Sequence, residues 1–329
     1  MKAPRRNAAT KYPGTICQLT GTQYPLIQGG MAWVSDASLA AAVSMAGGLG
    51  VIAAGNAPPE WVETQVKLLR EKTDKPFGLN VMLLSPYVSQ IADLVCALKV
   101  PVVITGAGNP DAYVKRWKEA GSMVAPVVAS RALAMLMERM GADFVIAEGS
   151  EAGGHIGELT SMVLWPDIAR SVNIPVVAAG GIFDASGIAA AFCLGAKGVQ
   201  VGTRFILAEE CTAHAEYKER VVRAKDVDSK VTGRITGHPV RVLRSPLQRE
   251  LAGAEYGPDG AAAVEKLGEG SLMRAVLHGD KEHGSFMAGQ CACMCERIQP
   301  ASEIIQELFD PAAIKAALFK AIACLEADA

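Results

Sequence analysis

The chain contains 329 residues, of which 50% are hydrophobic, and carries a formal net charge of −2. No run approaches the about 18 to 20 uninterrupted apolar residues that span a bilayer, and the charge balance does not favour nucleic acid as a partner. Arg5 and Arg6 precede no apolar segment of the kind that an export signal requires. We therefore interpret them as a solvated basic tail and expect a cytoplasmic protein.

Eight short apolar runs alternate with amphipathic stretches between Pro25 and Gly202. The runs are β-branched, unalternating and about five residues long, which is typical of strands buried on both faces. They are Pro25–Gln28, Gly50–Ala54, Phe77–Val81, Pro101–Thr105, Met123–Val127, Phe144–Glu148, Pro175–Ala179 and Gly198–Gly202. The helical patterns between them include Pro59–Glu71, Asp111–Ala120, Arg131–Met140 and Ala185–Leu194. This alternation predicts an α/β fold, a closed (β/α)8 TIM barrel, with an open doubly wound sheet as the alternative.

The alternation ends after Thr203. Residues 204–289 are charged, glycine-punctuated and helical in pattern, so we expect a helical insertion that covers the active site and contains no further buried strand. Residues 1–203 and 290–329 would then form the barrel. The closing helix is predicted from Ser302 to Leu325 and is interrupted at Pro311, because proline removes a helical hydrogen bond and clashes with the preceding turn.

Eight cysteines are ordinary for a chain of this length in a reducing compartment. Cys291, Cys293 and Cys295 alternate along the chain but lack the paired C-x2-C spacing of structural zinc sites. Buried or semi-buried thiols are favoured over a metal site, and we expect no bound metal.

Glycines follow the last two predicted strands. Gly180 and Gly181 end the seventh strand, and the segment Gln200–Thr203 ends the eighth. In a TIM barrel these two loops commonly bind phosphate, since glycine lets backbone N–H groups approach the ligand. The alternative is that the glycines only make tight turns. A phosphate site alone does not distinguish FMN from a sugar phosphate or pyridoxal phosphate.

The segment Gly48–Ala53 fits the pattern G-x-G-x-x-A of dinucleotide-binding folds. That pattern binds a dinucleotide only where it follows a strand and opens a helix. Here it follows a predicted helix and leads into a strand, so we reject a Rossmann site.

His155 is the candidate catalytic residue. It lies in a glycine-dense loop after the sixth predicted strand, and the ordinary pKa of histidine suits proton transfer near neutral pH. The alternative is a structural histidine. The other four histidines lack such a setting and are expected at surfaces or interfaces, although His238 and His278 lie in segments that could fold over the site.

Seven segments occur in order along the chain: QGGMAWVSD, AAGNAP, PFGLNVMLLSP, TGAGNP, IAEGSEAGGHIG, AAGGI and VQVGTRF. With these motifs the chain closely resembles the flavin-dependent enoyl-acyl-carrier-protein reductases of type II fatty-acid synthesis. It resembles slightly less closely the bacterial nitronate monooxygenases, which share that barrel. The likeness runs from about Tyr24 to past Gln290, and Ile156 favours the reductases because the monooxygenases more often carry arginine after the histidine.

The resemblance implies an FMN site and assigns residues to it. Backbone contacts are implied for the loop after the first strand, ring contacts for the third and sixth strands, and phosphate contacts for the seventh and eighth. The assigned residues are Gly30, Met31, Ala32, Asn80, Glu148, Gly153, Gly181, Gln200, Val201, Gly202 and Thr203. His155 matches the family histidine beside the flavin.

The implied reaction transfers a hydride from NADH or NADPH through FMN to Cβ of a trans-2-enoyl thioester. An acyl-carrier protein would present the thioester, and the resemblance implies a homodimer. The alternatives are a nitronate monooxygenase, which oxidises alkyl nitronates with oxygen, a flavin-binding protein without turnover, and, more distantly, a sugar-phosphate lyase or isomerase.

An acidic carrier protein predicts a basic docking face. Between Lys218 and Arg249 the chain holds nine basic and three acidic residues, and Arg241 and Arg244 are the candidate contacts. The alternative is an ordinary solvated face.

Overall fold

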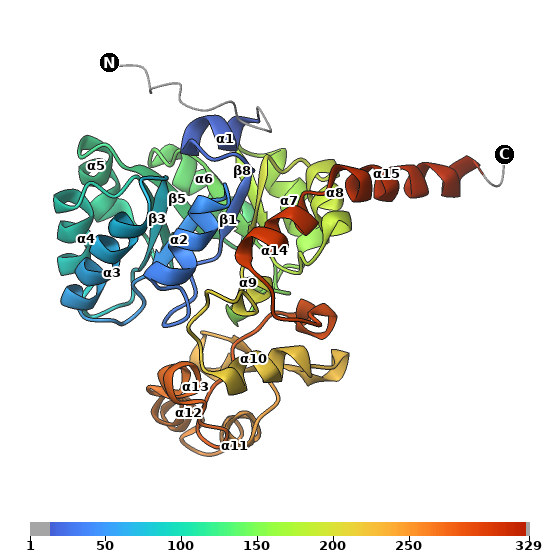
Figure 1. Ribbon diagram of the computed structural model, residues 1–329. Helices are drawn as coiled ribbons and strands as arrows, with labels where there is room; N and C mark the ends of the chain where they lie inside the picture. The colour runs from blue at the N-terminus through green and yellow to red at the C-terminus, as the bar shows by residue number, and fades with distance from the viewer. Residues whose placement is uncertain (1–13, 327–329) are drawn as a thin grey trace.

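The computed structural model describes residues 14–326, so the basic segment with Arg5 and Arg6 lies outside the described residues. A barrel ringed by helices forms one half of the molecule, and the insertion lies against one end of it (Figure 1). The C-terminal helix α15 (Pro311–Glu326) projects away from both (Figure 1). Over the described range, no helix is both long and apolar enough to cross a bilayer.

Eight parallel strands form the barrel, in the order β1-β9-β8-β6-β5-β4-β3-β2. The ring closes where Ile27 of β1 pairs with Leu49, directly before β2. The strands are β1 Leu26–Gln28, β2 Gly50–Ala53, β3 Phe77–Met82, β4 Val102–Gly106, β5 Met123–Val128, β6 Val145–Glu148, β8 Val176–Ala179 and β9 Gly198–Val201. Each predicted run matches one strand to within one residue at either end. The TIM-barrel prediction is confirmed, and the open-sheet alternative is wrong.

Apolar side chains fill the barrel interior. Ile27, Ile104 and Val177 are fully buried there, together with the other members of one cluster. β-Branched side chains suit this position because they pack well on a pleated surface. Ile16 of α1 (Thr15–Thr20) belongs to the same cluster, so α1 covers the N-terminal end of the barrel. The opposite end, where the strands finish, faces the insertion (Figure 1).

Helices on the outside connect consecutive strands. They are α2 Ala37–Met45, α3 Pro59–Lys72, α4 Val88–Ala97, α5 Asp111–Glu119, α6 Arg131–Arg139, α7 Ser161–Ala169 and α8 Ala185–Cys193. The four helices predicted in this part of the chain are confirmed. Several begin at a capping side chain: Asp36 accepts hydrogen bonds from two amides of α2, and Ser130 accepts one from Leu133.

The insertion is only partly helical. Its elements are α9 Thr203–Ile206, α10 Ala215–Val222, β10 Ser229–Thr232, β11 Val240–Leu243, α11 Pro246–Ala254, α12 Gly260–Gly268 and α13 Ser271–His278. Strands β10 and β11 pair antiparallel, and β11 also pairs with β7 (Gly154–His155) in the loop after β6. The expectation of no further buried strand is therefore wrong. The run Val240–Leu243 is buried over its last three residues, and its four-residue length hid it among charged neighbours.

The chain returns to the barrel through a 3-10 helix (Gln290–Met294) and α14 (Ala301–Leu308). The predicted closing helix is divided, because α14 ends at Leu308 and α15 begins at Pro311. Proline occupies the first turn of α15, where its missing N–H group costs no hydrogen bond. The predicted interruption is confirmed. The predicted division into domains at residues 203 and 289 stays a prediction.

Candidate active site

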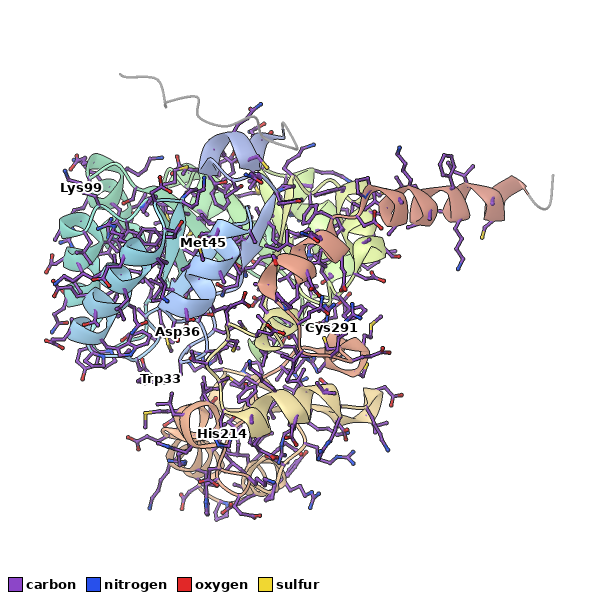
Figure 2. The ribbon with its side chains drawn as sticks, in the orientation of Figure 1. Trp33, Asp36, Met45, Lys99, His214 and Cys291 are labelled. Carbon is purple, nitrogen blue, oxygen red and sulfur yellow. The ribbon has the colours of Figure 1, made fainter. Side chains whose placement is uncertain are left out.

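A cavity of about 1190 Å³ opens at the C-terminal ends of the barrel strands, between the barrel and the insertion. Trp33 and Cys291, which both line it, lie in the zone where the two parts meet (Figure 2). The cavity brings together every site residue predicted from the sequence. These are Gly30, Met31, Ala32, Asn80, Glu148, Gly153, His155, Gly181, Gln200, Val201, Gly202 and Thr203.

The loop after β1 lies directly against β3. A Cβ atom at Gly30 would overlap the Cβ of Asn80, so only glycine allows this approach. The side chain of Asn80 projects from β3 into the cavity beside this loop. The two residues therefore form one wall, although they are fifty positions apart in the sequence.

The turn after β8 requires glycine for its backbone conformation. Gly180 and Gly181 have φ angles of 100° and 74°, in the left-handed region. A Cβ at Gly180 would lie 2.9 Å from the carbonyl oxygen of Gly149, so this turn packs its bare backbone against the loop after β6. At the end of β9, Thr203 accepts a hydrogen bond of 2.8 Å from the amide of Gly289.

Glu148 and Gln200 bring to the cavity acceptor atoms that have no partner among the described residues. The carboxyl group of Glu148 makes no hydrogen bond to the described residues, and burial raises its pKa to about 7. The Oε1 atom of Gln200 is also buried, and no described donor reaches it. Buried polar groups such as Gln200 Oε1 are nearly always hydrogen-bonded, so a ligand would supply the donor there, and it could also reach the half-buried carboxyl group of Glu148.

His155 lies on β7 and faces the cavity. Its strand is held by β11, where Val240 is its partner, and the next amide, of Ile156, donates to Pro239 O at 3.0 Å. Desolvation lowers the pKa of His155, and the electrostatic interaction with the nearby His238 lowers it further. The imidazole is therefore neutral at neutral pH.

The remaining histidines divide between the cavity and the surface. His238 lines the cavity, as its segment predicted. His214 accepts a hydrogen bond from the Glu216 amide and caps α10, and His283 lies 3.3 Å from the Asp280 carboxylate. His278 is not among the cavity-lining residues.

Trp33 and Glu151 are among the cavity residues that were not predicted from the sequence. Trp33 has a φ of 65°, an uncommon conformation for a bulky residue, and its ring centroid lies 6.0 Å from that of Trp61. Glu151 accepts hydrogen bonds from the amide and hydroxyl of Ser161 and so ties the loop after β6 to α7. Both lie in sequence motifs that also contain predicted site residues, and this neighbourhood in sequence could have identified them as site residues.

The proposed basic docking contacts need correction. Arg241 is only 7% exposed, and Lys218 is buried with its ammonium donating to Ala208 O at 2.7 Å. Arg244 is exposed but hydrogen-bonds Val227 O on its own surface. Arg241 therefore cannot contact a carrier protein, because its guanidinium points into the fold.

The three alternating cysteines lie in and after the 3-10 helix rather than in a strand. Cys291 and Cys295 are buried, and the Cys295 thiol lies 3.4 Å from the Cys291 carbonyl oxygen, whereas Cys293 is exposed. Within residues 14–326, no group of three or more His, Cys, Asp or Glu side chains is arranged to hold a metal ion.

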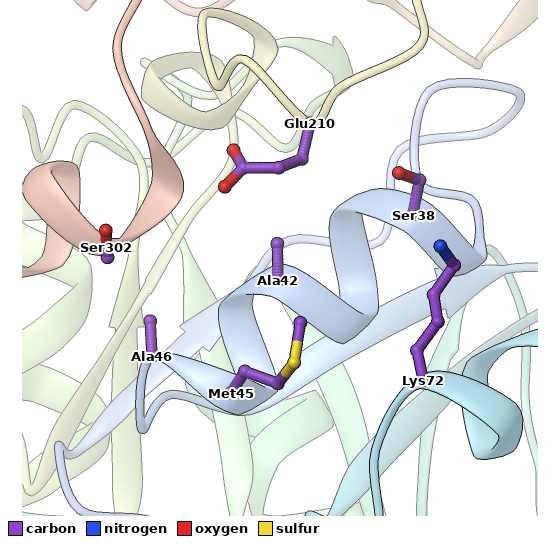
Figure 3. Close-up of a pocket in the computed structure, with 7 residues that line it drawn as sticks. All are labelled: Ser38, Ala42, Met45, Ala46, Lys72, Glu210 and Ser302. Atoms are coloured by element: carbon purple, nitrogen blue, oxygen red, sulfur yellow. The ribbon is translucent and has the colours of Figure 1, made fainter.

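A second hollow of about 520 Å³ lies outside the barrel mouth, along α2 (Figure 3). Its lining brings a single carboxylate and a single ammonium group to a surface of alanine, serine and one exposed methionine. The lining residues are Ser38, Ala42, Met45, Ala46, Lys72, Glu210 and Ser302. None of the predicted site residues contributes to it.

The fold and the position of the main cavity define a (β/α)8-barrel enzyme that holds its ligands on the loops after the strands. The model of the nitronate monooxygenase family matches residues 15–93 and 85–310, so the chain belongs to this family. Its members are FMN-dependent oxidoreductases.

Solved structures agree with this assignment. FabK from Thermotoga maritima is 47% identical, with a TM-score of 0.91, over 95% of this chain and 99% of its own. A nitroalkane oxidase from Streptomyces ansochromogenes is 29% identical, with a TM-score of 0.81, over 93% and 99%.

Curated relatives carry two kinds of name. A probable nitronate monooxygenase from Staphylococcus saprophyticus is 33% identical, and the match covers 80% of this chain and 93% of that protein. A (3aS,4S,5R,7aS)-5-hydroxy-7a-methyl-1-oxo-octahydro-1H-indene-4-carboxyl-CoA dehydrogenase from Mycobacterium tuberculosis is 35% identical over 77% of this chain and 72% of that protein.

Proposed function

We propose that this protein is an FMN-dependent enoyl-acyl-carrier-protein reductase that uses NADH or NADPH. The observation that carries the proposal is the 47% identity, over 95% of the chain, with FabK, an enoyl-acyl-carrier-protein reductase. The nitroalkane oxidase reaches only 29%. The carboxyl-CoA dehydrogenase at 35% identity supports a thioester as the substrate class.

The cavity fits FMN. A flavin ring carries an N–H donor and its ribityl chain carries hydroxyl donors, which match the partnerless acceptors of Glu148 and Gln200. Asn80 would hydrogen-bond the ring edge from β3. The phosphate would bind at the turns containing Gly181 and Thr203, where the backbone is bare.

When bound, FMN supplies hydride transfer between a nicotinamide and an electron-poor carbon. The protein must then stabilise the negative charge that develops on the thioester oxygen and deliver a proton to Cα. The neutral imidazole of His155 would donate a hydrogen bond to that oxygen, and it would serve as the acid only after taking up a proton from solvent. Next to the imidazole, the bare backbone of Gly153 packs against the backbone of Ala288 and Gly289, where a Cβ atom would not fit.

The cavity continues beyond the predicted FMN residues into the insertion. Leu251, Val264 and Leu272, from α11, α12 and α13, line this part with apolar surface. The cavity of about 1190 Å³ includes the predicted FMN site as well as this part. This space suits an acyl chain, whereas a small nitronate would leave it unused.

We propose that the protein binds an acyl-carrier protein and forms a homodimer. With Arg241 and Lys218 buried, the exposed bases Arg234 and Arg249 remain as docking candidates on the insertion. Arg234 follows Gly233, which lines the cavity, so a carrier docked there would stand at the entrance.

Anaerobic stopped-flow spectroscopy tests the proposed reaction. NADH or NADPH should bleach the bound flavin within the time of one turnover, and crotonyl thioester should then restore its colour. The second candidate, a nitronate monooxygenase, is supported by the family match and the Staphylococcus relatives. Slow bleaching combined with oxygen-dependent consumption of a nitronate would replace the reductase by that activity.

A further inference from the structure

Arg241 is a buried cation contributed by the insertion. It lies on β11 with 7% of its surface exposed. Burial lowers the pKa of its guanidinium, and the charge of Glu151 nearby opposes this shift. A charge buried in this way destabilises a fold unless its hydrogen bonds are well made.

The guanidinium makes those bonds to two segments. Nε and Nη2 both donate to the carbonyl oxygen of Ser150, at 3.1 and 2.8 Å. Nη1 donates to the hydroxyl of Ser229 on β10, at 2.9 Å. Ser150 follows β6 directly after Gly149, so Arg241 grips the loop that joins Glu148 to His155.

The same loop is held a second time by backbone pairing. Arg241 is the register partner of Gly154, and Val240 is the partner of His155. Strand β7 has only two residues, and a strand this short has no independent stability. The position of His155 therefore depends on β11, which is held to the loop by Arg241.

We infer that Arg241 is a positioning residue, whose guanidinium clamps the loop between β6 and β7 to the insertion and so holds His155 at the cavity. The inference rests on the proposed function in that His155 acts on the substrate. Arg241 itself touches neither the substrate nor the reacting atoms.

The test compares four variants of the FMN-loaded protein. Arg241→Met removes all three hydrogen bonds. Arg241→Lys keeps the positive charge but has only one donor nitrogen, and Ser229→Ala removes only the bond from Nη1. Arg244→Met is the matched control, because Arg244 directly follows β11 but is exposed and points away from the cavity. The readouts are amide exchange of Ile156 by NMR or mass spectrometry, and the separate kcat and KM for crotonyl thioester.

Hydrogen bonds from a charged donor are worth enough that Arg241→Met should speed exchange at Ile156 by about tenfold to a hundredfold. A similar loss is expected in kcat with KM changed less than about threefold, since orientation rather than substrate contact is lost. Arg241→Lys should recover part of both effects, Ser229→Ala should show a smaller change in the same direction, and Arg244→Met should match the wild type.

The inference is overturned if Arg241→Met leaves exchange and kcat within about twofold of the Arg244→Met control. If Arg241→Met does not fold, Ser229→Ala decides: unchanged exchange and kcat in that variant would overturn the inference. Amide exchange at Ile156 is measured without substrate, so it tests the role of Arg241 separately from the proposed reductase activity. A wild type that does not reduce enoyl thioesters would refute the reductase, while faster exchange in Arg241→Met would still support the clamp.

Discussion

Glu148→Gln should stabilise the flavin-free protein above neutral pH. Glutamine has nearly the same shape but no charge, so it removes the cost of an ionised carboxylate without partners in the cavity. Burial raises the pKa of Glu148 from an ordinary 4.5 to about 7. A raised carboxyl pKa means that the folded state resists ionisation, so the wild type loses stability relative to the variant as pH rises between these two values.

The size of the effect follows from that difference. A change from 4.5 to about 7 corresponds to about 3.5 kcal/mol, at about 1.4 kcal/mol for each pH unit. Part of the carboxyl surface faces solvent in the cavity, which reduces the penalty, so we expect about 2 kcal/mol at pH 8. For a protein of this size, that raises the melting temperature by about 3 °C.

The assay is thermal unfolding of flavin-free wild type and Glu148→Gln between pH 4 and 9. The two melting temperatures should agree near pH 4, diverge between about 4.5 and 7, and stay apart above that. Glu63→Gln is the control, since its partner Lys67 lies in the same exposed helix and such pairs contribute less than about 1 kcal/mol. Parallel curves for wild type and Glu148→Gln would refute the reasoning. FMN should also stabilise the variant less than the wild type.

Three further predictions concern the site and its support. His155→Ala should lower kcat about a hundredfold while FMN stays bound. Because the pKa of His155 is lowered, the acidic limb of the wild-type pH–rate profile should lie below pH 6.5, the ordinary pKa of histidine. An unchanged rate and pH profile in the variant would show that His155 has no catalytic role. Gly30→Ala should abolish FMN binding, measured by fluorescence titration, because the new methyl group overlaps Asn80; unaltered affinity would contradict the assigned loop. Arg204→Met should cost about 1 kcal/mol in urea unfolding at pH 7, because its partner Glu307 is 40% exposed. Burial raises the pKa of Glu307, but hydrogen bonds and the guanidinium charges lower it by more. The difference in unfolding free energy between wild type and Arg204→Met should therefore shrink below pH 4.5, and a difference that grew there would contradict the ion pair.

The barrel strands were predictable because each signal is local. A run such as Val102–Gly106 is buried on both faces, so composition alone marks it as an interior strand. The turns after β6, β8 and β9 were predictable for a similar reason. Gly181, for example, has a left-handed backbone conformation that favours glycine over other residues.

Strand β11 and its contacts were not predictable in this way. It pairs with β10 along its whole length and with β7 at its first two residues, and β7 lies 85 positions earlier and is too short to be a strand by itself. Arg241 looked like a solvated base because sequence shows charge but not direction.

The sequence by itself determined the barrel and the loops that carry the site, because apolar runs and glycines act over a few residues. It also marked His155 by its glycine-dense loop, whereas the role of Glu148 was implied by the family resemblance. Only the tertiary structure decided what surrounds them. Strand β11 of the insertion pairs with β7 at the barrel mouth and so positions His155. In the cavity, the side-chain oxygens of Glu148 and Gln200 have no hydrogen-bond donor from the described residues. Desolvation and long-range pairing depend on segments far apart in the chain, so the pKa of a carboxyl and the partner of a buried arginine appear only when the chain has folded.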